Sequence, residues 1–229
     1  MRILVVIPAA GSGTRFGGDI PKQFRPLQGK PVLQHVVERF LVHEDVARIM
    51  VAVTEKLLTV VAQNESDRVR FTAGGETRLD SVMSAFTAAG DDGYDIVAVH
   101  DAVRPFFFDA TFIEAVSTAA EFGAAMPGIP IIDTLHAVRN EFIDTTFDVS
   151  SLVLAQTPQC FRYEVLRDVL YKAAAEHERG TDEAGLAARF GVKVKLIPGD
   201  PMNFKITHPD DLAVAEAIMA RWGQQGAQP

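Results

Sequence analysis

Apolar residues along the chain occur in two patterns, short uninterrupted runs and longer stretches with helical spacing. Uninterrupted runs, which are typical of strands buried on both faces, occur at Ile3–Ile7, Ile49–Val53 and Ile96–Val99. The stretches between them carry apolar residues three and four positions apart, as from Val32 to Leu41, which indicates helices. Strands and helices that alternate in this rhythm are joined by right-handed parallel crossovers. The pattern therefore predicts an α/β fold with an open, doubly wound, mostly parallel (Rossmann-like) sheet.

Between Gly123 and Phe161 the helical spacing disappears. Short extended runs separated by turns predict a β-arm that projects from the domain at about residues 130–158. An arm with apolar positions and little core of its own needs a partner surface, so we expect a homodimer in which two arms embrace. The chain is thus expected to form a single domain over residues 1–229, with the arm as an insertion and a disordered tail from about residue 223.

The remaining segments carry shorter signals. Asp109 precedes an apolar helical stripe and is expected to be the N-cap of that helix. Beyond the arm, a helix is expected at about residues 163–178, and Thr181-Asp182-Glu183 is expected to cap the next one. Short strands are expected at Val192–Ile197 and Asn203–Ile206, before a last helix.

Composition excludes several classes of protein. The 229 residues carry a formal net charge of −8 and 48% hydrophobic side chains, which is enough for a sizeable core. The acidic balance argues against a general nucleic-acid binder, because no basic excess displaces counterions from a phosphate backbone. The N-terminal apolar run is too short for a signal peptide or a membrane span. With Cys160 as the single cysteine, we expect a cytoplasmic protein without a membrane partner.

The loop after the first strand has the composition of a phosphate cradle. It reads Pro8-Ala9-Ala10-Gly11-Ser12-Gly13-Thr14-Arg15-Phe16 and leads to Lys22. Its small side chains allow backbone N–H groups to approach phosphate oxygens, and Arg15 and Lys22 add positive charge. Phe16 stands where a dinucleotide fingerprint needs a small residue, and the Walker sequence is missing from the chain. A tight strand-to-helix turn with two solvated cations is the structural alternative.

Two further segments follow strands of the predicted sheet. Gly74-Gly75-Glu76 precedes a helix that contains Ser81, and Asp101 follows the strand that ends near His100. Ligands of open α/β sheets bind beyond the carboxyl ends of the strands, so these segments and the first loop are expected to face one pocket. Asp101 is the candidate ligand for the Mg²⁺ ion that accompanies a nucleoside triphosphate. His100 is expected to be a hydrogen-bonded core residue rather than a general base.

The loop Pro8-Ala-Ala-Gly-Ser-Gly-Thr-Arg15, followed by Pro21-Lys22-Gln23 and by His100-Asp-Ala-Val-Arg-Pro105, resembles the 2-C-methyl-D-erythritol 4-phosphate cytidylyltransferases. The resemblance extends from Pro8 to Leu212. It implies a Mg²⁺-dependent nucleotidyltransferase that transfers CMP from CTP to this sugar phosphate and releases pyrophosphate, in the non-mevalonate isoprenoid pathway. It also implies a homodimer in which each arm helps to build the neighbouring subunit's sugar-phosphate site.

The resemblance also assigns roles to residues of this chain. Catalytic roles, which are charge stabilisation and orientation of the attacking phosphate, fall on Arg15, Lys22 and Lys205. Nucleotide-binding roles fall on Pro8, Ala9, Ala10, Gly11, Ser12, Gly13, Gly75, Glu76, Ser81, Asp101 and Ala102. Substrate-binding roles fall on Arg104, Thr134 and Thr181.

One position departs from the family pattern. Relatives typically place an arginine after the aspartate in Asp-Arg-x-x-Leu to hold the substrate phosphate, whereas Val149 stands there in this chain. A cytidylyltransferase for ribitol 5-phosphate or another alditol phosphate is therefore an alternative, although relatives of that kind tend to open with Leu-Ala-Gly-Gly. A non-catalytic nucleotide-binding regulator on the same fold is a second alternative. A nicotinamide-dependent dehydrogenase is disfavoured by Phe16.

Overall fold

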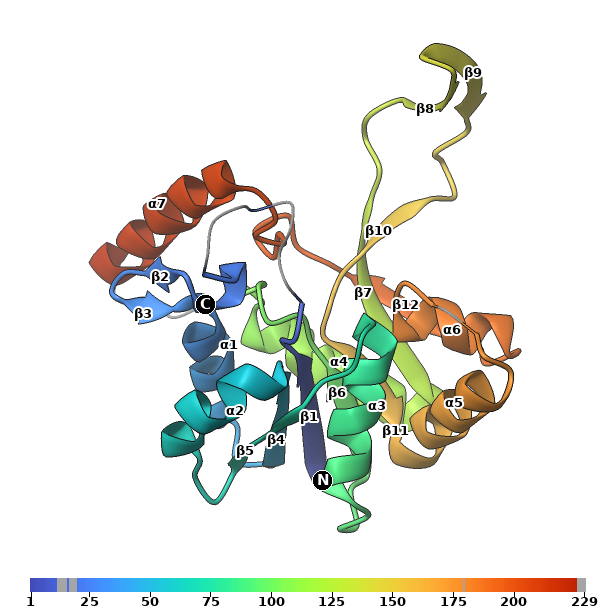
Figure 1. The fold of residues 1–229 in the computed structure, drawn as a ribbon. Coiled ribbons are helices and arrows are strands. Elements are labelled where there is room, and N and C mark those ends of the chain that lie inside the picture. The colour runs from blue at the N-terminus through green and yellow to red at the C-terminus, as the bar shows by residue number, and fades with distance from the viewer. Residues whose placement is uncertain (12–15, 17–19, 179, 226–229) are drawn as a thin grey trace.

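The computed structural model describes residues 1–11, 16, 20–178 and 180–225. Its centre is an eight-stranded sheet with the strand order β10-β7-β11-β6-β1-β4-β5, in which β12 also pairs with β7 (Figure 1). The strands of this sheet are β1 (Ile3–Pro8), β4 (Val46–Val53), β5 (Val69–Ala73), β6 (Ile96–Val99), β7 (Ala124–Pro130), β10 (Val153–Ala155), β11 (Gln159–Arg162) and β12 (Lys195–Pro198).

Seven α-helices surround the sheet within the described residues. They are α1 (Val32–Leu41), α2 (Glu55–Val61), α3 (Arg78–Ala89), α4 (Asp109–Phe122), α5 (Tyr163–Ala175), α6 (Glu183–Arg189) and α7 (Pro209–Gln225). Two 3₁₀ turns, η1 (Lys22–Phe24) and η2 (Ala62–Asn64), and the small strand pair β2 (Pro26–Leu27) and β3 (Lys30–Pro31) complete this part of the chain. None of the helices in the described segments combines the length and the apolar character needed to cross a membrane.

The two halves of the sheet differ in strand direction. Strands β6, β1, β4 and β5 run parallel to one another, as the alternation of apolar runs and helices predicts. In the other half, β11 runs antiparallel to both β6 and β7, and β10 runs antiparallel to β7. The chain leaves the sheet through β7 and returns through β10 and β11 without a crossover helix, which requires opposite directions. The prediction of an open, mostly parallel α/β sheet is confirmed, with a mixed half beside the parallel one.

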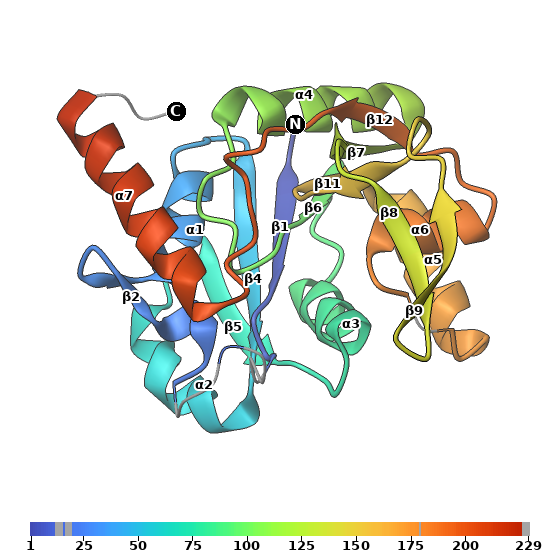
Figure 2. The ribbon, with the colours of Figure 1, turned by 90° about the horizontal axis from the view of Figure 1, so that it is seen from above.

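Helices cover both faces of the sheet, which explains why β1 is apolar at every position. Ile3, Val5 and Ile7 pack with α1 and α4 on one face. Leu4 and Val6 pack with α3, α5 and α6 on the other (Figure 2). A third cluster, which includes Phe106 and Ile206, lies under α7. Side chains that alternate between two buried faces leave no position for a polar residue.

The arm projects away from the sheet (Figure 1). Its end is a hairpin of β8 (Leu135–Arg139) and β9 (Phe142–Phe147), which pair antiparallel through a turn at Asn140 and Glu141, both at positive φ. Strand β10 belongs to the main sheet, where Val153 pairs with Pro130, so the projecting part spans residues 131–152. All six residues of β9 are exposed, and a two-stranded hairpin with so little burial is marginally stable alone.

Several predicted local features are wrong, each for an identifiable reason. Asp109 is the first residue of α4 rather than its N-cap, and its carboxylate accepts a hydrogen bond from Arg39 at 2.9 Å. Helix α5 ends at Ala175 because His177 adopts a positive φ of 53° and the Glu178 N–H bonds back to the Ala173 carbonyl. Strand β12 begins only at Lys195, where pairing with β7 begins.

The C-terminal part also differs from the expectation. Residues 203–206 form no strand. Side-chain contacts and single backbone hydrogen bonds hold this segment in place of the regular hydrogen bonds between paired strands. The Ile206 N–H, for example, bonds to the Val103 carbonyl at 3.0 Å. Helix α7 continues to Gln225, two residues beyond the expected start of the tail at about residue 223. Residues 226–229 lie outside the described part of the chain.

Candidate functional site

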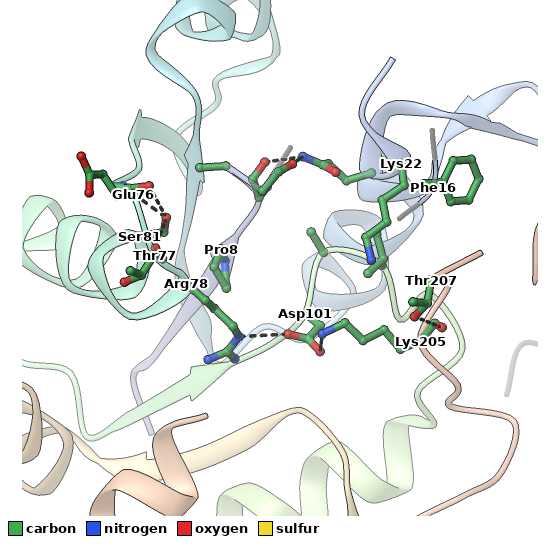
Figure 3. A pocket seen from close by; sticks show the side chains of 17 residues that line it. Pro8, Phe16, Lys22, Glu76, Thr77, Arg78, Ser81, Asp101, Lys205 and Thr207 are labelled. Atoms are coloured by element: carbon green, nitrogen blue, oxygen red, sulfur yellow. Dashed lines mark hydrogen bonds and ion pairs between the residues drawn. The ribbon is translucent and has the colours of Figure 1, made fainter. Parts of the chain in front are cut away.

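A cavity of about 560 Å³ opens at the carboxyl ends of β1, β5 and β6 (Figure 3). Its lining contains many of the predicted site residues, namely Pro8, Ala9, Ala10, Gly11, Lys22, Gly75, Glu76, Ser81, Asp101, Ala102 and Lys205. Ser12, Gly13 and Arg15 lie outside the described residues. Three strand ends thus deliver two loops and one carboxylate to a single cavity, as expected for an open α/β sheet.

The first loop is held in place by Gln23, a residue that sequence reasoning did not assign to the site. Its buried side-chain amide donates to the carbonyls of Ala9 at 2.6 Å and Gly11 at 3.0 Å. A Cβ atom added to Gly11 would meet nothing within 4 Å, so this position faces open space. Sequence reasoning missed Gln23 because a polar residue near a glycine loop does not by itself indicate burial. The available signal was its place directly after Lys22 in Pro21-Lys22-Gln23.

The second loop approaches the first so closely that it requires glycine. A Cβ atom on Gly74 would lie 2.5 Å from the Cβ atom of Ala10. Helix α3 then begins with Thr77 as N-cap, in a capping box with Asp80. Ser81 accepts a hydrogen bond from the Gly75 N–H at 3.2 Å and donates to the Thr77 carbonyl at 3.0 Å. Ser81 therefore shapes the backbone that lines the cavity, while Glu76 is exposed at its edge.

Asp101 lies at the centre of a group of cations. Its Oδ1 atom is 3.3 Å from Arg78 Nε, and its Oδ2 atom is 3.0 Å from Lys205 Nζ and 3.3 Å from Arg104 Nε. Burial alone would raise the pKa of Asp101, but the charges of Arg78, Lys205 and Arg104 outweigh it and hold the pKa far below its usual range. Asp101 is therefore a carboxylate at every physiological pH.

Arg78 also contacts a second carboxylate. Its Nη1 atom donates to both oxygens of Glu183, at 2.7 and 2.8 Å, and the Glu183 side chain is fully buried at the start of α6. Burial would lower the pKa of Arg78, but the charges of Glu183 and Asp101 raise it further above its usual range. Sequence reasoning placed Glu183 in the cap of a helix and assigned neither residue to the site, because a glutamate in the first turn of a helix ordinarily indicates a solvated charge.

Two lysines of the site are held by a segment near the end of the chain. Lys205 is paired with Asp101, and Lys22 Nζ donates to the Ile206 carbonyl at 3.1 Å. The segment itself is fastened through Asn203, whose carbonyl accepts a hydrogen bond from Arg104 Nη1 at 2.7 Å and whose side chain donates to the Thr157 carbonyl at 2.8 Å. Arg104 thus directs its hydrogen bonds to protein oxygens and is absent from the described lining of the cavity.

The other predicted substrate-binding residues lie elsewhere in the same chain. Thr134 is exposed on the arm, and Thr181 is exposed before α6, whose N-cap is Asp182. Val149 is half-buried between β9 and β10. Arg162, a conceivable substitute for the family arginine, donates to the carbonyls of Ala120 and Glu121 at the end of α4. Within the described part of the chain, the cavity is therefore lined by nucleotide-binding candidates and two lysines, but not by these residues.

His100 is a hydrogen-bonded core residue, as predicted. It is fully buried, its Nε2 atom lies 3.0 Å from the Arg104 carbonyl, and its Nδ1 atom lies 3.0 Å from the Thr157 hydroxyl. The contact with a carbonyl requires a proton on Nε2, so Nδ1 accepts from the hydroxyl. Burial is the main reason that the pKa of His100 falls from 6.5 to about 3. His100 therefore stays neutral and cannot serve as a base for the cavity.

The depressed pKa of His100 makes stability depend on pH. Because the folded pKa is about 3 and the ordinary value is 6.5, protons favour the unfolded chain between these values. The fold therefore has its full stability, as far as His100 is concerned, above pH 6.5, and it loses stability as the pH falls from 6.5 towards 3. We expect this group to cost ~2 kcal/mol of unfolding free energy between pH 7 and pH 5. Urea unfolding of the wild type and of His100→Gln at both values tests this; equal pH slopes for the two proteins would contradict it.

Metal binding would have to rely on few protein ligands. Within the described segments, no group of three or more His, Cys, Asp or Glu side chains is arranged to hold a metal ion. Mg²⁺ often takes only one or two carboxylates and completes its shell with phosphate oxygens and water. Asp101, ionised and at the cavity wall, fits that mode as a single carboxylate ligand.

Comparisons with known proteins agree with this geometry. A family model described as 2-C-methyl-D-erythritol 4-phosphate cytidylyltransferase matches residues 3–221. A protein of that name from Acidobacterium capsulatum is 42% identical, over 94% of this chain and 96% of its own length. The crystal structure of 2-C-methyl-D-erythritol 4-phosphate cytidylyltransferase from Thermus thermophilus is 32% identical with a TM-score of 0.81, over 96% of this chain and 100% of that chain. The one from Francisella tularensis is 28% identical with a TM-score of 0.84, over 95% and 99%. The family model spans almost the whole sequence, residues 3–221 of 229, and the chain therefore belongs to the 2-C-methyl-D-erythritol 4-phosphate cytidylyltransferase family.

Proposed function

We propose that the protein transfers the CMP moiety of CTP to 2-C-methyl-D-erythritol 4-phosphate. The products are 4-diphosphocytidyl-2-C-methyl-D-erythritol and pyrophosphate, and the reaction serves isoprenoid precursor biosynthesis by the non-mevalonate route. Family membership supports this activity. The structural observation that carries it is the meeting of a small-residue loop, Lys22, Lys205 and Asp101 in one cavity.

The chemistry needs neutralisation of charge rather than a base. A phosphate oxygen of the sugar phosphate is already anionic, so it can attack the α-phosphorus of CTP directly. A bond forms between that oxygen and the phosphorus, and the bond to the bridging oxygen of pyrophosphate breaks, so that pyrophosphate leaves with the electron pair. Negative charge builds up on the α-phosphate and on the leaving group, where fixed cations stabilise the transition state.

Particular residues would supply that charge. Lys22, together with Arg15 as the resemblance implies, stabilises the triphosphate, and Lys205, which is paired with Asp101, orients the attacking phosphate. The backbone around Ala9–Gly11 and Gly75 binds the nucleotide, and Ser81 keeps the second loop in shape. Mg²⁺, held by Asp101 and phosphate oxygens, would neutralise charge on the triphosphate when bound. His100 is buried in the core and takes no proton in this scheme.

Pyrophosphate release tests the activity and its acceptor. With CTP and Mg²⁺, we expect release with 2-C-methyl-D-erythritol 4-phosphate and a rate at least ~100-fold lower with ribitol 5-phosphate. EDTA is expected to abolish release in the same assay. Val149, which replaces a family arginine, is the observation that favours the second acceptor. Release with ribitol 5-phosphate alone would mean that this position marks a changed acceptor, and nucleotide binding without release would support a regulator.

The projecting arm supports a homodimer as the functional form. It exposes large apolar side chains, among them Ile132 at 91%, Phe142 at 76% and Ile143 at 67%. Apolar groups gathered on a marginal hairpin are stabilised when a second surface covers them. In the dimer that we propose, Thr134 of one subunit reaches the sugar-phosphate site of the other.

Removal of apolar side chains from the arm is expected to weaken the dimer. Light scattering of the wild type should give twice the chain mass of 24.9 kDa. The combined substitutions Phe142→Ser and Ile143→Ser should raise the dimer dissociation constant by ~100-fold or more, because each removes an apolar side chain that the proposed dimer would bury. Val60→Ser, on an exposed apolar residue of α2, is the matched control. A monomeric wild type at micromolar concentration would disprove the dimer.

A further inference from the structure

A row of four charged side chains runs from the protein interior to the cavity: Glu183, Arg78, Asp101 and Lys205. We propose that Glu183 and Arg78 are positioning residues for Lys205. Glu183 fixes the guanidinium of Arg78, which in turn fixes and neutralises Asp101, so that Asp101 holds Lys205 at the cavity without cancelling its charge. This inference rests on the proposed function, in which Lys205 orients the attacking phosphate.

The contacts of the row leave little freedom to its inner members. Nη1 of Arg78 is shared by the two oxygens of Glu183, and Nε of the same guanidinium contacts Oδ1 of Asp101. A planar guanidinium that is bound at two nitrogens cannot rotate without breaking a charged hydrogen bond. Asp101 then presents Oδ2 to Lys205 at 3.0 Å. The orientation of each member therefore depends on the previous one.

The row joins four separate parts of the fold. Glu183 is the first residue of α6, and Arg78 is the first residue of α3. Asp101 follows the end of β6, and Lys205 belongs to the segment before α7, which no strand pairing holds in place. The backbone of this segment is held by Asn203 and Ile206, through hydrogen bonds with Arg104 and Val103. The ion pair with Asp101 is the contact that orients the side chain of Lys205.

The distribution of charge explains why a second carboxylate is needed. Asp101 contacts three cations, Arg78, Arg104 and Lys205. Burial raises the pKa of Glu183, but both of its oxygens accept from the Arg78 guanidinium, so Glu183 contributes a second negative charge behind Arg78. The cluster keeps one positive charge in excess. The two ends of the row differ most in exposure: the Glu183 side chain is 1% exposed and that of Lys205 is 35% exposed, with Arg78 at 24% and Asp101 at 10% between them. The excess charge therefore faces the cavity, where an anionic phosphate arrives.

Burial of the Glu183 carboxylate costs hydration free energy, and a role in the site would explain why the residue is there. A carboxylate taken out of water loses several kcal/mol of hydration, and the attraction to a partner often only balances this loss. Glu183 is absent from the described lining of the cavity, so it cannot touch a substrate there. Its contact with Arg78, which does line the cavity, is the route by which it affects the reaction.

A double-mutant cycle distinguishes positioning from a general effect on folding. The wild type, Glu183→Gln, Lys205→Ala and the double variant are compared by pyrophosphate release with CTP and 2-C-methyl-D-erythritol 4-phosphate. Glu183→Gln is expected to lower kcat by ~10-fold or more and to change the KM for CTP by less than ~3-fold. In the Lys205→Ala background the same substitution is expected to change kcat by less than ~2-fold, because its effect passes through Lys205.

Two controls accompany the cycle. Glu178→Gln removes the carboxylate from another Glu–Arg pair of the same region, Glu178 with Arg189 on α6 at 2.7 Å, and should leave kcat within ~2-fold of the wild type. Glu183→Asp keeps the charge but shortens the reach to Arg78. It should also lower kcat through Lys205, and it takes the place of Glu183→Gln in the cycle if the glutamine variant does not fold.

The outcomes separate this inference from the proposed function. A wild type that releases no pyrophosphate with either sugar phosphate would refute the function itself. An active wild type in which the effects of Glu183→Gln and Lys205→Ala multiply would refute only the positioning role, as would a Glu183→Gln variant with an unchanged kcat. Loss of the Glu183 effect in the Lys205→Ala background establishes it.

Discussion

Replacement of Lys22 by alanine is expected to lower the rate of pyrophosphate release by ~10²–10³-fold. Lys22 lines the cavity, and its Nζ atom is held by the Ile206 carbonyl at 3.1 Å. A cation that is fixed in this way stabilises developing charge without having to reorganise during the reaction. Removal of such a preorganised group therefore lowers the rate strongly. The expected loss lies in kcat, since the charge of the triphosphate increases toward the transition state.

A second lysine provides the control. Lys30 pairs with Glu38 on the surface at 2.8 Å and is absent from the described lining of the cavity. Lys30→Ala should therefore leave the rate within ~2-fold of the wild type. If Lys22→Ala instead raised only the KM for CTP and kept kcat, Lys22 would bind the ground state and the transition state equally, contrary to the role assigned to it.

Replacement of Asp101 by asparagine is expected to be the most destabilising single change in the site. It would leave Arg78, Arg104 and Lys205 without the carboxylate that they share. Breaking a buried ionic contact by removal of one partner typically costs ~3–5 kcal/mol of unfolding free energy. Activity should fall by more than ~100-fold, because the position of Lys205 and the candidate Mg²⁺ ligand are lost together.

Unfolding by urea measures this cost, and Asp92→Asn serves as its control. Asp92 also pairs with an arginine, Arg2 at 2.6 Å, but the two side chains are 60% and 51% exposed. Removal of that charge should cost ~1 kcal/mol or less. Equal losses for the two variants would show that the cluster around Asp101 contributes no more than a surface pair.

The sequence predicted the parallel half of the fold and the location of the cavity because both depend on local patterns. Apolar runs such as Ile3–Ile7 and Ile96–Val99 define strands, and strands that alternate with helices leave few topologies. The residues that follow those strands, Ala9–Gly11 and Asp101, then come together at one edge of the sheet without further information. The family resemblance added Lys205.

Contacts between distant residues could not be predicted in this way. Arg78 meets Glu183 across 105 positions, and Lys22 meets Ile206 across 184. Neither the helical spacing around Glu183 nor the charge of Arg78 indicates which partner each one finds. Asp109 shows the same limit, because its residue type favours an N-cap position, whereas its carboxylate pairs with Arg39 of α1.

The failure at residues 203–206 has a different origin. Phe204 and Ile206 flank Lys205 in an alternating pattern that is typical of a strand. In the structure, Phe204 and Ile206 pack with Phe106 under α7, while Lys205 points to Asp101. The alternation thus reflects two different environments on either side of an extended segment, which a pattern cannot distinguish from a paired strand.

The late position of this segment has a consequence for protein synthesis. Strand β12 ends at Pro198, so a ribosome has made every strand of the central sheet before it adds Lys205 and the carbonyl that holds Lys22. A chain interrupted between these points would retain the arm at residues 131–152 while lacking a complete site. If arms join subunits as proposed, such fragments would assemble with intact chains, and premature termination would inactivate more protein than the truncated copies themselves.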